Sequence, residues 1–418
     1  MEAKDTQAKA SNAADRDNKG NRVDNIDRVN RVSKVLNVSN DNHTQHTKHG
    51  WEVKKLGEVA TILNGYAFDS KLFSEDSNDV PLIRIRDIKR GYTETFYKGD
   101  FSEEYIIRKG DYLIGMDGEF NIAEWKGENA LLNQRVCKII ANKIVDRYLF
   151  WYMPIVLKQI EDATPFVTVK HLSSKQLINT TIPIPPREEQ ERIVEELDCL
   201  SGVIERKREQ LKQLDALAQS IFYDMFGDPI SNEKGFPVYK IDDIITFQGG
   251  SQPDKSHFEY EPTDDNIRLI QIRDYKSDKN ITYIPKSLAR RLCNAEDIMI
   301  GRYGPPIFQI LKGIEGAYNV ALMKAIPKQG NREFIRAFLK QKCLLEYLES
   351  MSKRTAGQDG IQMDKLKAYP FPLPPIELQD EFADKIEAIE KQKELLKRSI
   401  KEVETLFDAR MDYYFGDT

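Results

Sequence analysis

Most of the chain consists of two tandem copies of one pattern, and this duplication restricts the possible folds more than any other feature. The copies cover residues 51–229 and 236–418, at an offset near 186 residues. Short motifs recur in the same order, as where residues 82–87 (LIRIRD) meet residues 269–274 (LIQIRD). A match at fixed offset indicates duplicated architecture. The sequence therefore predicts two similar folded parts.

Each copy ends in a stretch where the offset stays at 189 residues without drift, from Leu177 to the end. Surface loops tolerate inserted residues, whereas one insertion in a packed helix rotates its apolar face away from its partner. A Pro-Pro pair stands near the start of each stretch, at 185–186 and 374–375, and a glycine stands near its end. These residues favour the start and the end of a helix. We expect long helices over 187–229 and 376–418, each roughly 60 Å long at 1.5 Å per residue.

Apolar residues in both stretches alternate at spacings of four and three, the repeat of a coiled coil. The predicted seam comprises Ile193, Leu197, Leu200, Ile204, Leu211, Leu214 and Ile221 in the first helix, and Phe382, Ile386, Ile389, Leu396, Ile400, Val403 and Phe407 in the second. We expect the two helices to pack against each other through these side chains. The alternative is that each helix covers only its own globular domain.

The remaining parts, residues 51–186 and 236–375, mix helix and strand patterns. Alternation in residues 82–86 places Ile83 and Ile85 on one strand face and Arg84 and Arg86 on the other. Further strands are expected at 112–115, 135–140, 298–301 and 321–326, with helices at 147–160 and 332–352. The predicted class is α+β: two repeated α/β domains joined by two long antiparallel coiled-coil helices.

Residues 1–50 differ in composition from both copies. They contain no aromatic residue and carry nine basic and seven acidic side chains. Such a segment cannot bury much surface, so a polar, disordered tail is expected. Its histidines His43, His46 and His49 could hold a metal ion, but chance composition explains them better and no metal site is assigned.

Composition excludes several classes of protein. The four cysteines are far apart and form no C-x-x-C pair, which argues against a zinc ribbon or a disulfide framework. No apolar run approaches the roughly 20 residues of a membrane helix, and the N-terminus lacks a signal-peptide pattern. P-loop, metalloprotease and adenine-methyltransferase motifs are also missing from the sequence. We therefore expect a cytoplasmic protein without a catalytic or metal site of its own.

Charge is divided unevenly along the chain, whose net charge is -5. Residues 187–226 and 376–415, the main parts of the two predicted helices, together carry -8, and the parts outside these ranges and the tail carry 40 basic and 39 acidic residues. A DNA-binding protein that relied on electrostatics alone would be more basic. Specific readers need only local patches, because contacts to base edges carry the sequence information. Near-neutral domains are therefore compatible with specific DNA recognition.

The order of motifs resembles the DNA specificity subunit of type I restriction-modification enzymes. Each copy runs from a domain through a Pro-Pro pair and a Gln into a long helix, as in residues 184–190 (IPPREEQ) and 373–379 (LPPIELQ), and ends on Phe-Gly-Asp. Residues 64–68 (NGYAF), 81–85 (PLIRI) and 109–115 (KGDYLIG) are similar to that family's target recognition domain. The resemblance covers residues 51–418 and leaves the tail outside the family pattern.

The resemblance implies a non-catalytic subunit whose target recognition domains, 51–186 and 236–375, each read half of a bipartite, asymmetric double-stranded DNA site. It implies that the helices act as a ruler and dock two modification subunits, which carry S-adenosylmethionine and methylate adenine. Separate restriction subunits, with ATP and Mg²⁺, would translocate and cut. No cofactor is expected on this chain, and no membrane partner.

The candidates for DNA contact are polar or small residues on predicted strand faces and in aligned loops. They are Tyr66, Lys71, Arg84, Arg86, Asp117, Gly118, Glu119, Asn121 and Lys170 in the first copy, and Gln252, Lys255, Gln271, Arg273, Arg302, Tyr303, Gly304, Lys353, Arg354 and Gln358 in the second. Arginine suits guanine and glutamine suits adenine. An ordinary solvated surface is the alternative for each of them.

Two other kinds of protein remain as alternatives. One is a stand-alone DNA-modifying enzyme with an unusual active site, which would act on DNA without partners. The other is a coiled-coil scaffold that binds only proteins, which would select no DNA sequence.

Overall fold

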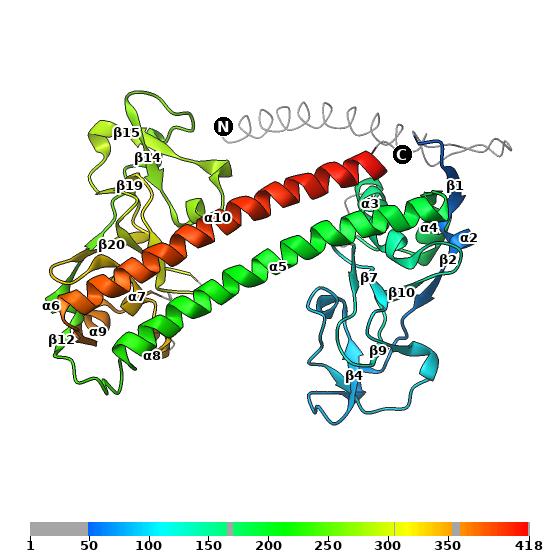
Figure 1. Cartoon of the computed structure of the whole chain (residues 1–418), viewed down its shortest axis with the longest axis horizontal. Coiled ribbons are helices and arrows are strands. Elements are labelled where there is room, and N and C mark those ends of the chain that lie inside the picture. The colour runs from blue at the N-terminus through cyan, green and yellow to red at the C-terminus, as the bar shows by residue number, and fades with distance from the viewer. Residues whose placement is uncertain (1–48, 165–169, 305, 353–359, 417–418) are drawn as a thin grey trace, which may run out of the picture. The chain divides into compact units, whose positions relative to one another are not determined.

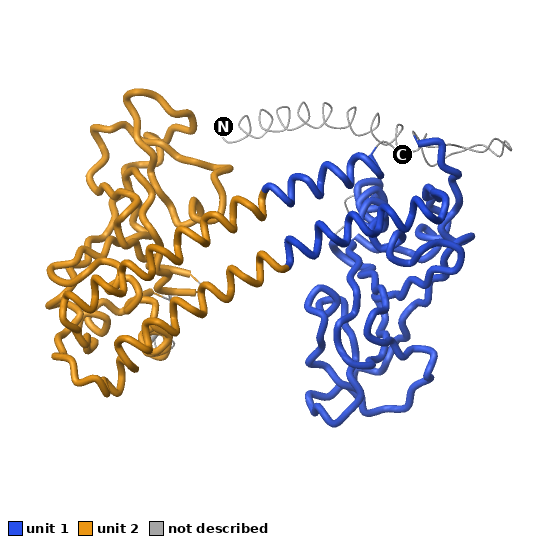
Figure 2. The backbone as a smooth tube through the Cα atoms, viewed as in Figure 1, with its two compact units in different colours: residues 1–205, 402–418 blue, residues 206–401 orange. Residues whose placement is uncertain are grey.

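The computed structural model describes residues 49–164, 170–304, 306–352 and 360–416. These residues form two compact units (Figure 2). Unit 1 comprises the described residues up to Glu205 and those from Glu402 onward, and unit 2 runs from Arg206 to Lys401. The expected tail of 1–50 lies almost wholly outside the described residues, and only His49 and Gly50 of it belong to unit 1. His43 and His46 are therefore outside them too.

Unit 1 contains two main sheets and a short pair of strands (Figure 1). The first sheet has the order β2-β10-β7-β8, with β2 Ala60–Asn64, β7 Tyr112–Gly115, β8 Asn121–Glu124 and β10 Val136–Ala141. The second has the order β3-β5-β4-β9-β6, with β3 Phe73–Ser74, β4 Val80–Ile83, β5 Phe96–Tyr97, β6 Ile106–Ile107 and β9 Ala130–Leu132. The pair joins β1 Glu52–Lys55 to β11 Thr181–Ile184. The helices are α2 Leu56–Val59, α3 Asp146–Ala163 and α4 Ser174–Asn179.

Alternating side chains place the first sheet of unit 1 between two layers. Ile114 and Cys137 face α3 and belong to one core cluster with Tyr148 and Tyr152 of that helix. Leu113, next to Ile114, belongs to a different cluster, which packs against the second sheet. This period of two is what a strand buried on both faces requires. The layers are therefore α3, the first sheet and the second sheet.

Unit 2 repeats this arrangement with small changes. Its first sheet has the order β13-β20-β17-β18, with β13 Ile245–Gly249, β17 Ile298–Gly301, β18 Gln309–Lys312 and β20 Leu322–Pro327. The second has the order β15-β14-β19-β16, with β14 Asn266–Ile270, β15 Tyr283–Pro285, β16 Leu292–Cys293 and β19 Gly316–Tyr318, and the pair joins β12 Val238–Lys240 to β21 Pro370–Pro372. The helices are α6 Ile241–Ile244, α7 Arg332–Leu339, α8 Lys342–Ser352 and α9 Met363–Ala368. The duplication predicted from the sequence is thus confirmed.

The two long helices are α5 Arg187–Phe226 and α10 Ile376–Phe415, each of 40 residues. They end near the expected places, and Gly227 follows α5 with a φ of 72°. In unit 1 Arg410 of α10 pairs with Glu196 of α5, and its neighbour Tyr414 lies one turn later beside the same carboxylate. In unit 2 Lys393 of α10 pairs with Asp215 of α5, while Phe382 packs on Phe222. Within each unit the two helices therefore run antiparallel.

All predicted seam positions of the two helices are buried or half-buried. Ile193, Leu197, Ile204, Phe382, Ile389 and Ile400 are buried, and the other eight seam residues are half-buried. Ile193 and Leu197 join the core of unit 1, whereas Phe382 joins that of unit 2. The helices thus pack on each other and also on the domains, so the two alternatives for the seam are both partly realised.

Most predicted elements are present, with two differences. The helix expected over 332–352 is interrupted between α7 and α8, where Lys340 caps the end of α7. The strand expected over 82–86 ends at Ile83, and residues 85–87 form a 3-10 helix instead. None of the helices in the described ranges combines the length and the apolar character of a membrane span.

Candidate nucleic-acid interface

In unit 1 the strand register brings four chain segments together where the strands of the first sheet begin or end. We refer to this end of the strands as the edge of the sheet. Asn64, at the end of β2, lies opposite Cys137 near the start of β10. Gly115, at the end of β7, lies opposite Val136 of β10 and Asn121 of β8. The turns that follow or precede these residues must therefore lie side by side. They contain the candidates Tyr66, Asp117, Gly118, Glu119 and Asn121.

Unit 2 has the same edge in its own first sheet. Gly249 of β13 lies opposite Met323 of β20, and Gly301 of β17 lies opposite both Leu322 of β20 and Gln309 of β18. The turns at this edge contain Gln252, Arg302, Tyr303 and Gly304. We call these two sets of turns edge 1 and edge 2.

A glycine at each edge permits a close approach of two backbones. A Cβ atom on Gly65 would lie 2.1 Å from the carbonyl oxygen of Asn133, and one on Gly250 would lie 1.9 Å from that of Asn319. Real side chains cannot occupy such space. The contact orders edge 1, because Tyr66 then donates its amide to Leu132 and accepts from the amide of Gln134.

The two arginines expected on an outward strand face instead belong to a 3-10 turn, with Arg84 just before it and Arg86 within it. The carboxylate of Asp87, which is 1% exposed, accepts hydrogen bonds from the amide of Arg84 and the hydroxyl of Thr93. This acceptor turns the chain out of the strand after Ile83, so the predicted alternation of Arg84 and Arg86 was wrong. Both side chains are nevertheless exposed. The turn lies close to edge 1, because Ile85 packs on Gly115 and Lys89 pairs with Glu119 at 3.0 Å.

The second copy makes the same turn. Asp274, 7% exposed, accepts from the amide of Gln271, and the predicted strand ends at Ile270. The side chains of Gln271 and Arg273 both donate to the hydroxyl of Thr282, at 3.0 Å each. Ile272 packs against Gly301, as Ile85 does against Gly115. Arg273 is exposed, whereas Gln271 is half-buried.

Two loops that are far apart in sequence meet at each edge. In unit 1 a bridge pairs Asp117 with His171, and the amide of Gly118 donates to the carbonyl of Lys170 at 3.0 Å. In unit 2 the equivalent bridge pairs Tyr303 with Gly360. Gly118 and Gly304 occupy matching positions with φ of 74° and 97°, a conformation that favours glycine. The aligned loops that the sequence singled out are thus brought together in both copies.

Edge 1 carries a cluster that the sequence did not single out. The guanidinium of Arg135 lies 3.3 Å from the Asp117 carboxylate and 3.2 Å from Nδ1 of His171, which itself lies 2.6 Å from that carboxylate. Arg135 has a φ of 72°, a strained conformation for a side chain other than glycine. Comparison of the copies could have found it, since Ala321 stands at the matching position.

Edge 2 presents an arginine from a different strand end. Arg302 donates through its guanidinium to the carbonyl of Val320 at 3.3 Å, and the guanidinium carbon lies 5.3 Å from the Tyr303 ring centroid. Tyr303 is 44% exposed. Tyr318 holds the end of β13 near this edge, because its hydroxyl donates to the side-chain oxygen of Gln248 at 2.9 Å. Burial raises the pKa of Tyr318 to about 12. This hydroxyl therefore stays protonated as a donor at neutral pH.

The other candidates are placed less favourably. Lys170 lies on Glu161, donating to its carbonyl at 2.9 Å, so its charge is already compensated. Lys71 and Lys255 lie in 3-10 turns, and within the described ranges no side-chain hydrogen bond joins them or Gln252 to an edge. Lys353, Arg354 and Gln358 fall outside the described residues. Tyr66 is 52% exposed and packs on Phe68 and Tyr105.

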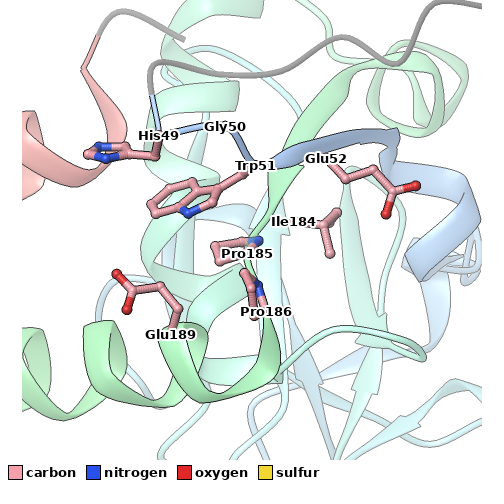
Figure 3. Close-up of a pocket in the computed structure, with 8 residues that line it drawn as sticks. All are labelled: His49, Gly50, Trp51, Glu52, Ile184, Pro185, Pro186 and Glu189. Atoms are coloured by element: carbon pink, nitrogen blue, oxygen red, sulfur yellow. The ribbon is translucent and has the colours of Figure 1, made fainter.

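A pocket of about 650 Å³ lies elsewhere in unit 1, beside the start of α5 (Figure 3). Trp51, Pro185 and Pro186 form its apolar wall, and His49 stacks on Trp51 at 4.5 Å. Glu189, its acidic side chain next to the prolines, is paired with Arg192 at 2.6 Å, and this hydrogen bond holds the pKa of Glu189 below its usual value. The pocket is thus a packing site for residues 49–51, the first that the structure describes. The described parts of the chain contain no group of three His, Cys, Asp or Glu side chains suited to a metal ion.

Known proteins share both the sequence pattern and the fold. A family model described as "Type I restriction modification DNA specificity domain" matches residues 48–216 and 233–405. The type I restriction enzyme EcoBI specificity subunit of Escherichia coli is 29% identical over 379 residues, covering 81% of this chain and 79% of that protein. The MjaVIII specificity subunit of Methanocaldococcus jannaschii is 22% identical over 392 residues, covering 85% and 89%.

A solved structure is also similar. The crystal structure of the type I restriction-modification S subunit from M. genitalium superposes with a TM-score of 0.55 at 12% identity, covering 91% of this chain and 99% of that one. At this identity the likeness is one of fold.

Proposed function

The chain belongs to the type I restriction-modification DNA specificity family, and on this basis we propose that it reads a bipartite, asymmetric double-stranded DNA site, one half with each edge. The observation that carries the proposal is that one backbone geometry recurs at two sheet edges with different side chains. Edge 1 offers Arg135, Asp117 and Glu119, whereas edge 2 offers Arg302 and Tyr303. Two edges with the same backbone geometry but different side chains are suited to reading two half-sites of different sequence.

The side chains at the edges match the donors and acceptors of base edges. An arginine guanidinium can donate two hydrogen bonds to guanine, and a carboxylate can accept from the amino group of cytosine. Arg135 and Arg302 are the arginines held by partners at the edges themselves. Arg84, Arg86 and Arg273 lie next to the edges on exposed turns and would contact phosphates, which position the protein without reading sequence.

Catalysis is assigned to partner subunits. We propose that this chain supplies recognition only, and that it assembles with two modification subunits and with restriction subunits in the cytoplasm. S-adenosylmethionine would be bound by the modification subunits, and ATP and Mg²⁺ by the restriction subunits. The assembled complex would then methylate adenine within the recognised site, or cut DNA that carries this site.

The test is a map of adenine methylation across the genome of cells that express this chain with its modification subunit, compared with cells that lack this chain. We expect a new motif made of two short specific halves separated by a nonspecific spacer. If the complex assembles and no motif appears, the scaffold alternative is favoured. If the purified chain alone modifies or cleaves DNA, the assignment of catalysis to partners is wrong.

A further inference from the structure

The two units can be compared residue by residue at the place where a long helix begins. In unit 1 the amide of Val145 donates to Oε1 of Gln190 at 2.8 Å, and in unit 2 the amide of Asn331 donates to Oε1 of Gln379 at 2.8 Å. The offsets are 186 residues for the first pair and 189 for the second, the same as in the sequence. Positions in α3 therefore correspond to those in α7, and positions in α5 to those in α10.

In unit 1 the space between α3 and the two long helices is filled by aromatic rings. The indole of Trp151 packs edge-on against Phe407 with centroids 5.4 Å apart, and its Nε1 donates to Asp198 at 2.9 Å. Arg147 lies over the indole at 5.2 Å and also pairs with Asp198. The indole N–H, the Asp198 carboxylate and the Arg147 guanidinium of this arrangement therefore all have partners.

In unit 2 both aromatic residues are replaced by alanine. Ala337 stands at the position of Trp151, and Ala218 at that of Phe407. Both alanines line a cleft of about 560 Å³, whose wall also includes Phe222 and Phe382, 2% and 0% exposed. The loss of two rings from equivalent positions explains why this space is open, because a packed interior closes only partly around a deleted side chain.

Charged groups line the rest of the cleft, and one cation in the described part of the chain forms no direct ion pair. Lys393 pairs with Asp215 and Glu390, and Arg336 pairs with Glu333. Among the described residues, Lys340 has no carboxylate within ion-pair distance. Lys340 is exposed at the mouth of the cleft. Desolvation lowers its pKa, the nearby Glu390 carboxylate raises it, and the neighbouring Arg336 and Lys393 lower it again. An anion placed here would compensate this charge.

Two buried polar side chains in the wall also lack a partner for one of their atoms. Arg336 is 4% exposed, and its Nε has no hydrogen-bond acceptor among the described residues. Gln341 is 6% exposed, and its Oε1 has no donor there. Both residues line the cleft. Buried polar groups are normally paired, so these two atoms leave the wall of the cleft short of polar partners.

We propose that this cleft binds a small ligand that combines a planar aromatic ring with a carboxylate or similar oxyanion. The ring would occupy the space that Trp151 and Phe407 fill in unit 1, against Phe222 and Phe382. The oxyanion would pair with Lys340. The cleft is separate from edge 2, since Lys312 lines it and stands at the end of β18 opposite to the one that lies at the edge. The inference does not depend on the proposed function.

Calorimetric titration of the purified full-length chain tests the proposal with two probes, indole-3-acetate and its neutral analogue indole-3-acetamide. We expect one molecule of indole-3-acetate per chain, bound about tenfold more tightly than the amide, because only the carboxylate pairs with Lys340. The variant Lys340→Met should remove this preference. Its matched control, Lys365→Met, changes an exposed lysine of α9 outside the cleft and should keep it.

A second variant tests the place of the ring. Ala337→Trp restores the side chain of unit 1 and should abolish the binding of both probes without lowering the melting temperature. If that protein does not fold, Ala218→Phe, which restores the other ring, takes its place. The proposal is overturned if neither probe binds the unaltered chain, or if both filling variants bind indole-3-acetate as tightly as it does.

Discussion

Arg302 is the residue whose substitution should separate the two halves of the DNA site most cleanly. It occupies the position that Met116 has in unit 1, and the amides of both residues donate to matching carbonyls, Ala321 and Arg135, at 2.9 Å. The backbone is therefore the same and only the side chain differs. We expect Arg302→Gln to relax one base preference in one half of the methylated motif, at a cost of about 1–3 kcal/mol, and to leave the other half intact.

The same methylation map measures this change. Arg332→Gln provides the matched control, because Arg332 is exposed but follows the end of β20 that lies away from edge 2. It should leave the motif unchanged. A uniform loss of methylation over both halves with Arg302→Gln would contradict the assignment of edge 2 to one half-site.

Cysteine reactivity offers an independent check of the cores. Cys137 is fully buried, and burial raises its pKa from 9.0 to about 12, whereas Cys199 on α5 is exposed. Alkylation requires the thiolate, so at mildly alkaline pH iodoacetamide should modify Cys199 first and leave Cys137 unmodified until the chain is unfolded. Peptide mass spectrometry measures both sites. Equal rates for both in the native protein would show that the core opens readily.

The raised pKa of Cys137 also has a consequence for stability. The folded protein disfavours the thiolate, while the unfolded chain ionises near its ordinary value of 9.0. The contribution is therefore present below pH 9 and is lost as pH rises toward the folded value. The free energy of unfolding should fall over this range, and Cys137→Ala should reduce the fall.

At the residue scale, the sequence indicated the loops better than the side chains within them. Asp117 and Tyr303 were candidates for DNA contact, and each takes part in a bridge that joins two distant loops of its own unit. The role of Arg135 depends on a left-handed φ and on a histidine 36 residues away, neither of which a local pattern shows. Lys170 was a candidate for DNA contact, but its ammonium is held by Glu161.

At the scale of elements, the glycine at each edge is a residue that the fold cannot readily replace. Gly250→Ala would place a Cβ atom 1.9 Å from the Asn319 carbonyl oxygen, whereas Gly249→Ala meets only a guanidinium nitrogen of Arg302 at 3.9 Å. We expect Gly250→Ala to lower the free energy of unfolding by about 2 kcal/mol or more, and Gly249→Ala by less than about 1 kcal/mol. Urea unfolding of the two variants compares them. Equal stabilities would mean that the two backbones can separate at no cost.

The positions of the elements were predictable where a strong local signal exists. The strands β7 and β17 begin and end where expected, because apolar residues there are followed at once by glycine. The strand β4 was extended too far, since Asp87 ends it through a buried hydrogen bond to the amide of Arg84. In sequence that aspartate looks like any surface acid, and only its burial reveals its function.

At the scale of the whole molecule, the long helices should set the distance between the half-sites. Deleting seven residues from both α5 and α10 keeps each seam in phase and shortens each helix by roughly 10 Å, which corresponds to about three base pairs. We expect the spacer in the methylated motif to shorten by about that number. Deleting three residues from both helices turns the seams out of phase and should abolish assembly. If the seven-residue deletion leaves the spacer unchanged, the hypothesis that the helices set the half-site spacing is wrong.

The sharing of the two helices between the units affects the order in which the protein is completed. The core of unit 1 includes Tyr414 and Phe415, and the Phe415 ring packs on Tyr148 and Tyr152 from the first half of the chain. Unit 2, in contrast, is one continuous stretch. A ribosome releases the chain from its N-terminus, so every residue of unit 2 has emerged before unit 1 receives its last helical turns. The first copy to be translated is thus the last to be finished, and a premature stop close to the C-terminus would damage the half of the protein encoded at the opposite end of the gene.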